Sequence, residues 1–229
     1  LLITLFLRRR GWNVVFLGAV VPTERIEETL SIVRPQLVIL SAQTLMTALS
    51  LRDMARLLNQ KDIQAAFGGR VFNHISGLAS RIPAHFLGNT LEVAIPMVEN
   101  LITNPTPAPK EETTNKKLSQ IAMEYKEKLP MIEQEVSDYL QSHKQQIDFL
   151  DTANQFLGNT LSAALELGDI SYTATDIDWL TNLLIERNIS SSMLPLFLNL
   201  YAQAVRNVMG EDGQIIYDWL TMESQRLNV

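Results

Sequence analysis

Short apolar runs and longer amphipathic stretches alternate along the first hundred residues. Each short run is followed by a glycine or a polar turn, and the longer stretches repeat their apolar residues at helical spacing. The short runs predict buried strands and the longer stretches predict helices. We expect strands at 13–17, 37–40, 63–67 and 84–87, and helices at 1–10, 23–34, 47–60, 75–81 and 91–101.

Continuous apolar strands that alternate with helices predict a parallel sheet covered on both faces. Residues 1–103 therefore predict an α/β parallel-sheet domain of the Rossmann-like, flavodoxin-like type. This domain opens with a helix, whereas a doubly wound domain normally opens with a strand whose following loop contributes to the ligand site. We therefore expect the α/β domain to be N-terminally incomplete in this chain.

A proline-rich linker at 104–114 separates two halves of different pattern. Three prolines at alternate positions favour an extended, semi-rigid segment. Beyond it, residues 115–229 repeat apolar positions at helical spacing with short breaks, which predicts an all-α helical bundle of five or six helices. Pro130 lies inside one such pattern, so we expect one kinked helix that runs from Lys116 towards Leu150.

Helix-ending residues divide this second half further. Gly168 and Gly210 each follow an apolar helical pattern and are expected to end it. Asp176 or Asp178 can cap the next helix, and the serines at 190–192 can cap the one after. Asp169, Asp176 and Asp178 cluster near a helix start, and we interpret this cluster as capping and not as acid–base catalysis.

The composition excludes several classes of site. The chain has 229 residues, of which 46% are hydrophobic, and it has no cysteine. Disulfides, thiolate metal sites and cysteine nucleophiles are therefore excluded, and a reducing, cytoplasmic compartment is favoured. No apolar run is long enough for a membrane span. Residues 1–103 carry 10 Lys and Arg against 7 Asp and Glu, and residues 104–229 carry 9 against 18, so the acidic second half argues against nucleic-acid binding by that half.

The sequence contains no established catalytic motif. It has no GxSxG elbow, no P-loop and no GxGxxG, and its three histidines do not have the spacing of metal ligands. His85 is expected to lie in the core of a strand, and His143 on a polar helix face. His74 follows a glycine pair, where it lies either on a surface loop or at the lining of a pocket. We therefore expect a protein that is not an enzyme.

Small and hydroxyl-bearing residues follow the expected strands directly. They are Gly18 after the first, Ser41 and Thr44 after the second, Gly68 and Gly69 after the third, and Gly88 after the fourth. In an open parallel sheet, ligands bind beyond the carboxyl ends of the strands. Glycine lets a ligand approach the backbone, and hydroxyls donate or accept hydrogen bonds without charge. The set suits a bulky, mostly neutral heterocyclic ligand better than a triphosphate.

An ordered series of short motifs in this half resembles the cobalamin-binding domains of MerR-type regulators and corrinoid carrier proteins. The matching segments are GWNV at 11–14, FLGA at 16–19, VP at 21–22, RPQLV at 34–38, LS at 40–41, Thr44 and FGGR at 67–70. The resemblance covers about residues 1–103 and implies cobalamin as the cofactor. It implies that Ser41 bonds the displaced base of the cofactor, while Gly68 and Gly69 leave room for its nucleotide tail.

The chain departs from that family in three ways. The family's Asp-x-His-x-x-Gly loop, whose histidine is the lower cobalt ligand, is not in this sequence and would fall upstream of Leu1. The Ser-x-Leu element appears as Ser41-Ala42-Gln43, which keeps the serine and loses the leucine. The helical domain follows the α/β domain here, whereas it usually precedes it in relatives. We therefore expect no metal ligand from the chain itself.

Together these observations predict a cobalamin-binding-like sensory or regulatory module, as part of a transcriptional regulator or signalling protein. The alternatives are a corrinoid carrier of a methyltransferase system and a degenerate domain that serves as an interaction scaffold. The acidic bundle could form a homo-oligomer or bind another protein. Its aromatic residues are either a partner surface or core: Trp179, Tyr201, Tyr217 and Trp219. Nucleic acid would be bound only through an upstream domain.

One hexapeptide, FLGNTL, occurs twice, at 86–91 and at 156–161. The first copy follows an expected strand, whereas the second lies inside an apolar helical pattern. Because these contexts differ, we interpret the repetition as coincidence and not as a structural repeat.

Overall fold

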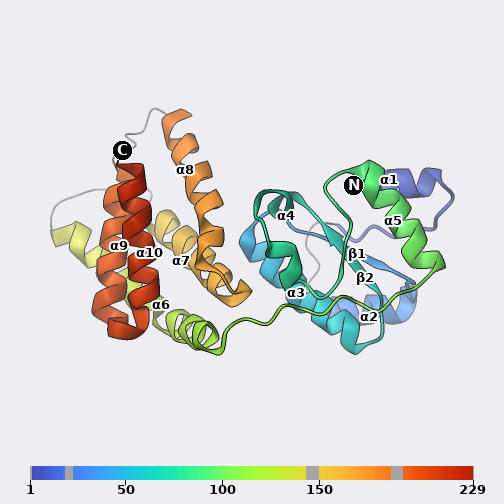
Figure 1. Ribbon diagram of the computed structural model, residues 1–229, viewed down its shortest axis with the longest axis horizontal. Coiled ribbons are helices and arrows are strands. Elements are labelled where there is room, and N and C mark those ends of the chain that lie inside the picture. Colours follow the sequence, from blue (N-terminus) through green and yellow to red (C-terminus); the bar gives the residue numbers. More distant parts are fainter. Residues whose placement is uncertain (1, 19–22, 143–149, 187–192, 229) are drawn as a thin grey trace. The chain divides into compact units, whose positions relative to one another are not determined.

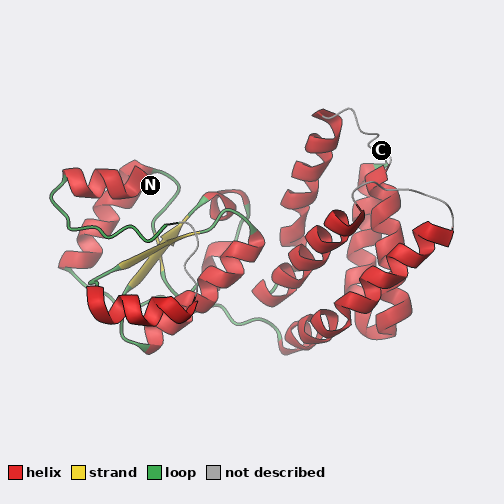
Figure 2. Ribbon diagram, turned by 180° about the vertical axis from the view of Figure 1, so that it is seen from behind, coloured by secondary structure: helices red, strands yellow, loops and turns green. Residues whose placement is uncertain are grey.

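The chain folds into two compact units, Leu1–Glu112 and Thr113–Val229 (Figure 1). The computed structural model describes residues 2–18, 23–142, 150–186 and 193–228. Within these residues the first unit holds a small parallel sheet with helices, and the second unit is helical (Figure 2). An α/β unit followed by a helical one agrees with the coarse prediction, but the sheet is smaller than predicted.

The elements of the first unit follow the predicted alternation in most places. They are α1 (Leu2–Arg9), α2 (Thr23–Val33), β1 (Val38–Ser41), α3 (Leu45–Gln60), β2 (Ala65–Gly68), α4 (Arg70–His74), the 3-10 helix η1 (Leu78–Arg81), β3 (His85–Phe86) and α5 (Leu91–Thr103). Among the described residues the strands form one parallel sheet in the order β1-β2-β3. Val38 pairs with Ala65 and Ser41 with Gly68, so β1 and β2 end level with each other.

Helices cover both faces of this sheet. Figure 1 shows α1 and α5 on one side of the strands and α2 and α3 on the other. On the first side, Ala66 of β2 packs in a cluster with Leu7 and Ile95. On the opposite side, the ring of Phe67 lies 4.7 Å from that of Phe72 and 5.4 Å from that of Phe86. Side chains therefore alternate between the two faces along β2, as the strand period requires.

The predicted strand at 13–17 is wrong, because the structure has no strand there. Val15, Phe16 and Leu17 are 52%, 50% and 44% exposed, although their types favour a buried strand. An extended segment becomes a strand only when a neighbour takes up its backbone hydrogen bonds. Among the described strands, β1 pairs only with β2, so the segment has no such neighbour.

The single helix predicted at 75–81 is also wrong. Within that range the structure has only η1, and α4 ends just ahead of it at His74. Ile75 after α4 is extended, and Gly77 ahead of η1 has a φ of +78°. A left-handed glycine between two short helical turns interrupts the apolar pattern that predicted one helix.

The proline-containing segment after α5 is held along the α/β unit. The guanidinium of Arg56 lies 2.6 Å from the carboxylate of Glu111. The backbone N–H of Glu112 donates to the carbonyl of Ser80 at 3.0 Å. These contacts place the segment, up to Glu112, within the first unit. Its proline content alone would predict a spacer that is independent of both units.

The second unit packs its helices around one apolar core. Its described elements are α6 (Lys116–Ser142), α7 (Leu150–Leu167), η2 (Ile170–Thr173), α8 (Ala174–Glu186), α9 (Met193–Met209), η3 (Gly210–Gly213) and α10 (Gln214–Leu227). As predicted, Pro130 lies inside one long helix, α6. Gly168 and Gly210 follow α7 and α9 with φ of +97° and +61°, the left-handed conformation expected after a helix.

The predicted caps of α8 are wrong. The helix begins at Ala174, so Asp176 lies in its first turn, and Asp178 pairs with Arg226 at 2.7 Å. The aspartate that caps is Asp169, whose carboxylate accepts from the N–H of Ser171 at 2.9 Å at the start of η2. The other predicted cap, at 190–192, lies outside the described residues.

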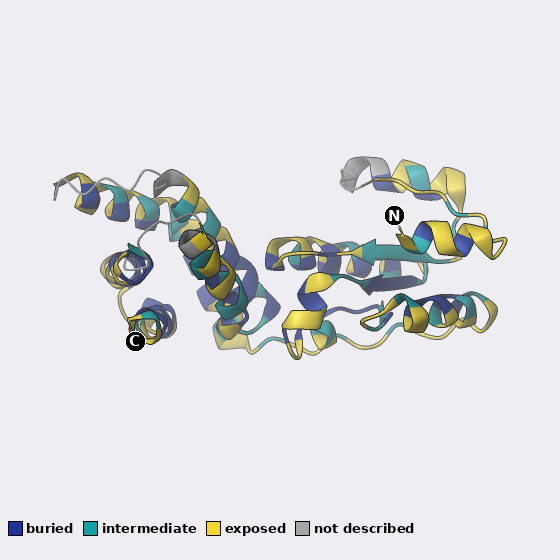
Figure 3. Ribbon diagram, turned by 90° about the horizontal axis from the view of Figure 1, so that it is seen from above, coloured by how far each residue is buried: buried dark blue, intermediate teal, exposed yellow. Residues whose placement is uncertain are grey.

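The aromatic residues of the helical unit divide between core and surface. Tyr201 and Trp219 are buried, and Tyr217 packs against the same core, whereas Trp179 is 48% exposed. Figure 3 shows that buried and exposed positions alternate along the helices. Three of the four residues proposed as a partner surface therefore belong to the core. Among the described helices, none combines the length and the apolar character that crossing a membrane requires.

Candidate functional site

The carboxyl ends of β1 and β2 bring together the main residues that the sequence singled out. Ser41 and Gly68 end these strands as register partners. The N–H of Ala42 donates to the carbonyl of Gly68 at 3.1 Å, which keeps the two following turns side by side. Because both strands end at the same edge, Ser41, Gly68 and Gly69 share one site at the edge of the sheet, as expected for parallel strands.

Ser41 presents a hydroxyl group at this edge. The residue is exposed, and its Oγ accepts a hydrogen bond from the amide of Gln43 at 3.4 Å. That bond leaves the hydroxyl proton of Ser41 available to donate. The side chain can therefore serve as a neutral hydrogen-bond donor to a ligand.

The two glycines of the pair have different surroundings. A Cβ on Gly68 would meet nothing within 4 Å, so open space lies in front of that backbone. A Cβ on Gly69 would collide with the carbonyl oxygen of Ala42 and lie 2.8 Å from its nitrogen, and Gly69 has a φ of +127°. Gly69 is therefore required by the fold, whereas Gly68 leaves room for a ligand.

Thr44 caps α3 and is fully engaged in that role. Its hydroxyl accepts from the N–H of Thr47 at 3.3 Å, and the hydroxyl of Thr47 accepts from the N–H of Thr44 at 2.9 Å. This reciprocal pair is a capping box that satisfies two backbone donors. The candidate ligand contact at Thr44 therefore has a structural explanation that needs no ligand.

Thr44→Ala is expected to lower the free energy of unfolding of the α/β unit by about 1 kcal/mol, because it removes the N-cap of α3. Thr44→Ser keeps the hydroxyl and is the matched control, with little change expected. Urea unfolding followed by circular dichroism measures both variants. An alanine variant as stable as the parent would show that the capping box contributes nothing.

The two outer glycines contribute less to this edge. Gly88 follows β3 with a φ of +78°, and a Cβ there would lie 2.9 Å from Val93. It therefore serves the turn between β3 and α5. Gly18 has a φ of +95° and nothing within 4 Å of its missing Cβ, but it follows the irregular segment and not a strand. Neither glycine is part of the register that aligns Ser41 with Gly68.

The histidines do not form a metal site in the described part of the chain. His74 ends α4 and is exposed. His85 lies in β3 as predicted, but it is half-buried, and its Nε2 lies 3.2 Å from the carbonyl oxygen of Thr106. Among the described residues, no group of three His, Asp or Glu could hold a metal ion. His143 lies outside the described residues.

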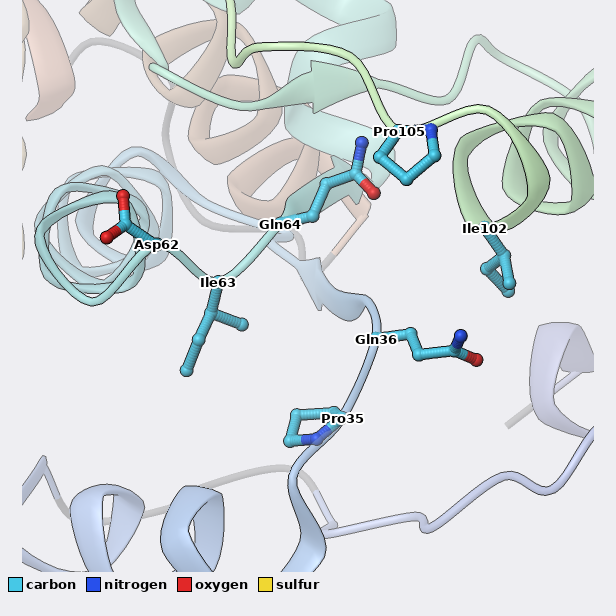
Figure 4. A pocket seen from close by; sticks show the side chains of 7 residues that line it. All are labelled: Pro35, Gln36, Asp62, Ile63, Gln64, Ile102 and Pro105. Carbon is cyan, nitrogen blue, oxygen red and sulfur yellow. The ribbon is translucent and has the colours of Figure 1, made fainter.

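A shallow hollow of about 310 Å³ lies at the other end of the strands (Figure 4). It is lined by residues ahead of β1 and β2, in the last turn of α5 and after α5: Pro35, Gln36, Asp62, Ile63, Gln64, Ile102 and Pro105. The amide of Gln64 donates to the carbonyl of Thr106 at 3.3 Å, so one of its polar groups already has a partner. The sequence reasoning missed this hollow, because it followed only the carboxyl ends of the strands.

A scan against models of known protein families finds no match for this chain, and a search of curated proteins finds none either. The residues of the site, and no matched relative, therefore provide the structural basis for a function.

Proposed function

We propose that the chain is a cobalamin-binding-like sensory or regulatory module of a transcriptional regulator or signalling protein. Its first unit would be a Rossmann-like, flavodoxin-like domain. The observation that supports the proposal is the meeting of the Ser41 hydroxyl with the open backbone at Gly68. That pair provides one neutral donor next to free space, which suits an uncharged heterocycle.

The residues present fit the nucleotide end of a cobalamin better than its cobalt. Ser41 would donate to a nitrogen of the base, and the space at Gly68 would admit the nucleotide tail along the backbone. The cofactor itself would supply a cobalt centre whose ligands can change. None of the described side chains at this edge is a histidine, so the lower ligand of the cobalt would not come from the chain's own residues there.

The second unit suits a role in signalling. Residues 113–229 carry 8 Lys and Arg against 16 Asp and Glu, and the described part is a packed helical bundle. No catalytic constellation accompanies that bundle in the sequence. The bundle would transmit the ligand state through a protein contact, and any nucleic-acid contact would belong to another domain.

Titration of the purified chain with methylcobalamin and with adenosylcobalamin tests the proposal. We expect weak binding, seen as a change in the visible absorption and as co-elution with the protein. Gly68→Leu should abolish it by filling the open space. Ser41→Ala should weaken it about 2- to 10-fold, since a net hydrogen bond contributes about 0.5–1.5 kcal/mol.

Ser50→Ala is the matched control for the serine variant, because Ser50 is exposed on α3 and its hydroxyl bonds only the carbonyl of Met46 in the described structure. It should bind as the parent does. A Kd of about 1 mM corresponds to a binding free energy of only about 4 kcal/mol. The ligand proposal is overturned if, with either cobalamin at about 1 mM, the visible spectrum is unchanged and no cobalamin co-elutes with the protein. The scaffold alternative would then account for the domain.

A further inference from the structure

The segment 105–112, here called the strap, is held to the α/β unit near both of its ends. Near its start, the carbonyl oxygen of Thr106 accepts from the amide of Gln64 at 3.3 Å and lies 3.2 Å from Nε2 of His85. At its end, two consecutive glutamates bind side chains of α3 and η1 (Figure 1). The strap therefore follows the surface of its own unit from the sheet to α3 and η1.

The two glutamates at the end of the strap have different partners. The carboxylate of Glu111 accepts from Nε and Nη2 of Arg56 at 2.9 and 2.6 Å, so the pair is bidentate. The hydroxyl of Ser80 donates to the carboxylate of Glu112 at 2.6 Å, and the N–H of Glu112 donates to the carbonyl of Ser80 at 3.0 Å. Because a bidentate arginine pair fixes orientation as well as distance, the end of the strap has a defined docked position.

Polar contacts hold the strap, because it buries little apolar surface. Of residues 105–112, only Ala108 and Glu111 are half-buried, and the others are exposed. The side chain of Arg56 is 45% exposed and also lies 3.3 Å from Asp53, which it keeps as a partner when Glu111 leaves. Exposed ion pairs contribute little to stability and are weakened by salt. The docked and released forms of the strap are therefore close in free energy.

The prolines of the strap favour its return to the docked position. Pro105, Pro107 and Pro109 fix φ at every second residue, so the released strap stays extended. A segment that is already extended loses little conformational freedom when it docks again. Release of the strap is therefore reversible.

We propose that the strap is a salt-sensitive latch that sets how far the helical unit can reach from the α/β unit. With the strap docked, residues 113–115 alone connect Glu112 to the start of α6 at Lys116. With the strap released, the connection consists of residues 105–115. Three residues span at most about 10 Å and eleven at most about 40 Å. The latch therefore changes the reach of the helical unit about four-fold.

This inference goes beyond the proposed function and needs no cobalamin. It bears on the protein contact through which the helical unit would act. A tether permits such a contact only when its length spans the distance between the two binding sites. The docked strap would restrict the helical unit to near partners, and the released strap would admit distant ones.

Amide hydrogen exchange at Glu112, read by NMR in the whole chain, tests the latch. Its N–H bonds Ser80 in the docked form. Raising NaCl from about 0.1 M to about 1 M shortens the screening length from about 10 Å to about 3 Å, so exchange at Glu112 should become at least about 3-fold faster. The N–H of Asn228, which donates to Gln225 at the end of α10, is the control for direct effects of salt and should change little.

Glu111→Gln removes the charge of the bidentate pair and keeps the shape of the side chain. At about 0.1 M NaCl, exchange at Glu112 should be about 3- to 10-fold faster than in the parent, and the effect of salt should largely vanish. Glu28→Gln is the matched control, because Glu28 is exposed on α2 of the same unit and loses the same charge. It should behave as the parent does.

Small-angle X-ray scattering measures the reach. The radius of gyration of Glu111→Gln should exceed that of the parent by at least about 2 Å, and Glu28→Gln should match the parent. An equal radius of gyration despite faster exchange at Glu112 would overturn the claim that the latch sets the reach.

Exchange at Glu112 that is the same at both salt concentrations and in Glu111→Gln would overturn the latch itself. If Glu111→Gln does not fold, the salt dependence in the parent decides the question, since it needs no variant. Cobalamin titration is a separate readout. A chain whose strap is released by salt but that binds no cobalamin would support this inference and count against the ligand alone.

Discussion

Replacing Gly69 with alanine is expected to unfold the α/β unit under conditions in which Gly68→Ala leaves it folded. Gly69 has a φ of +127° and a ψ of 163°, a conformation that is essentially restricted to glycine. A Cβ there would also collide with the backbone of Ala42. We expect a loss of about 3–5 kcal/mol, because backbone strain and steric overlap act together. Domains are stable by only about 5–15 kcal/mol, so this loss removes much of the stability.

Gly68→Ala is the matched control, because it changes the adjacent glycine by the same group. Its Cβ would meet nothing within 4 Å, and the expected change in unfolding free energy is within about 0.5 kcal/mol. Urea unfolding of both variants, followed by the near-ultraviolet signal of Trp12 for this unit, measures the difference. Equal stability of the two alanine variants would contradict the assignment of Gly69 to the fold and Gly68 to a ligand.

Tyr201→Phe is expected to destabilise the helical unit by about 1–3 kcal/mol, because it leaves a buried hydroxyl without its partner. The hydroxyls of Tyr125 and Tyr201 lie 2.8 Å apart, and both residues are fully buried. Burial raises the pKa of both phenols well above the usual range, so the pair stays neutral at ordinary pH. Removing both hydroxyls together is expected to cost little, since no buried donor is then left unpaired.

A double-mutant cycle of Tyr125→Phe, Tyr201→Phe and the double variant measures this coupling by urea unfolding. The two single losses should add up to clearly more than the loss in the double variant. Tyr139→Phe, on the same helix α6 and 45% exposed, is the control for a change of phenol to phenyl. Strict additivity would show that the two hydroxyls stabilise the core independently.

Several patterns that depend on neighbouring residues alone were read correctly from the sequence, although the caps of α8 were not. Gly168 and Gly210 follow helices as predicted, because left-handed glycine is a local requirement. Pro130 is tolerated inside α6, as the continuous apolar pattern around it indicates. The strand predicted at 13–17 is wrong because a strand needs a neighbouring strand to take up its backbone hydrogen bonds. The apolar residues of the segment cannot supply that neighbour.

The site was predictable only where topology fixes it. Ser41 and Gly68 meet because parallel strands end at one edge, which the alternating pattern already implies. The different roles of Gly68 and Gly69 depend on backbone angles and on the position of Ala42, which no spacing reveals. The capping role of Thr44 could have been found, because a threonine followed three residues later by Thr47 provides two side chains that reach the backbone.

The hexapeptide FLGNTL has two conformations in one molecule. At 86–91 it passes from the end of a strand through a left-handed Gly88 into the start of α5, whereas at 156–161 it is continuous helix in α7. The same six residues therefore do not determine a single backbone conformation, and the surrounding fold selects the one that each copy adopts. An antibody raised against the linear hexapeptide should accordingly bind two epitopes on the denatured chain. A conformation-specific reagent selected on either folded copy should ignore the other, and so report the folding of one unit at a time.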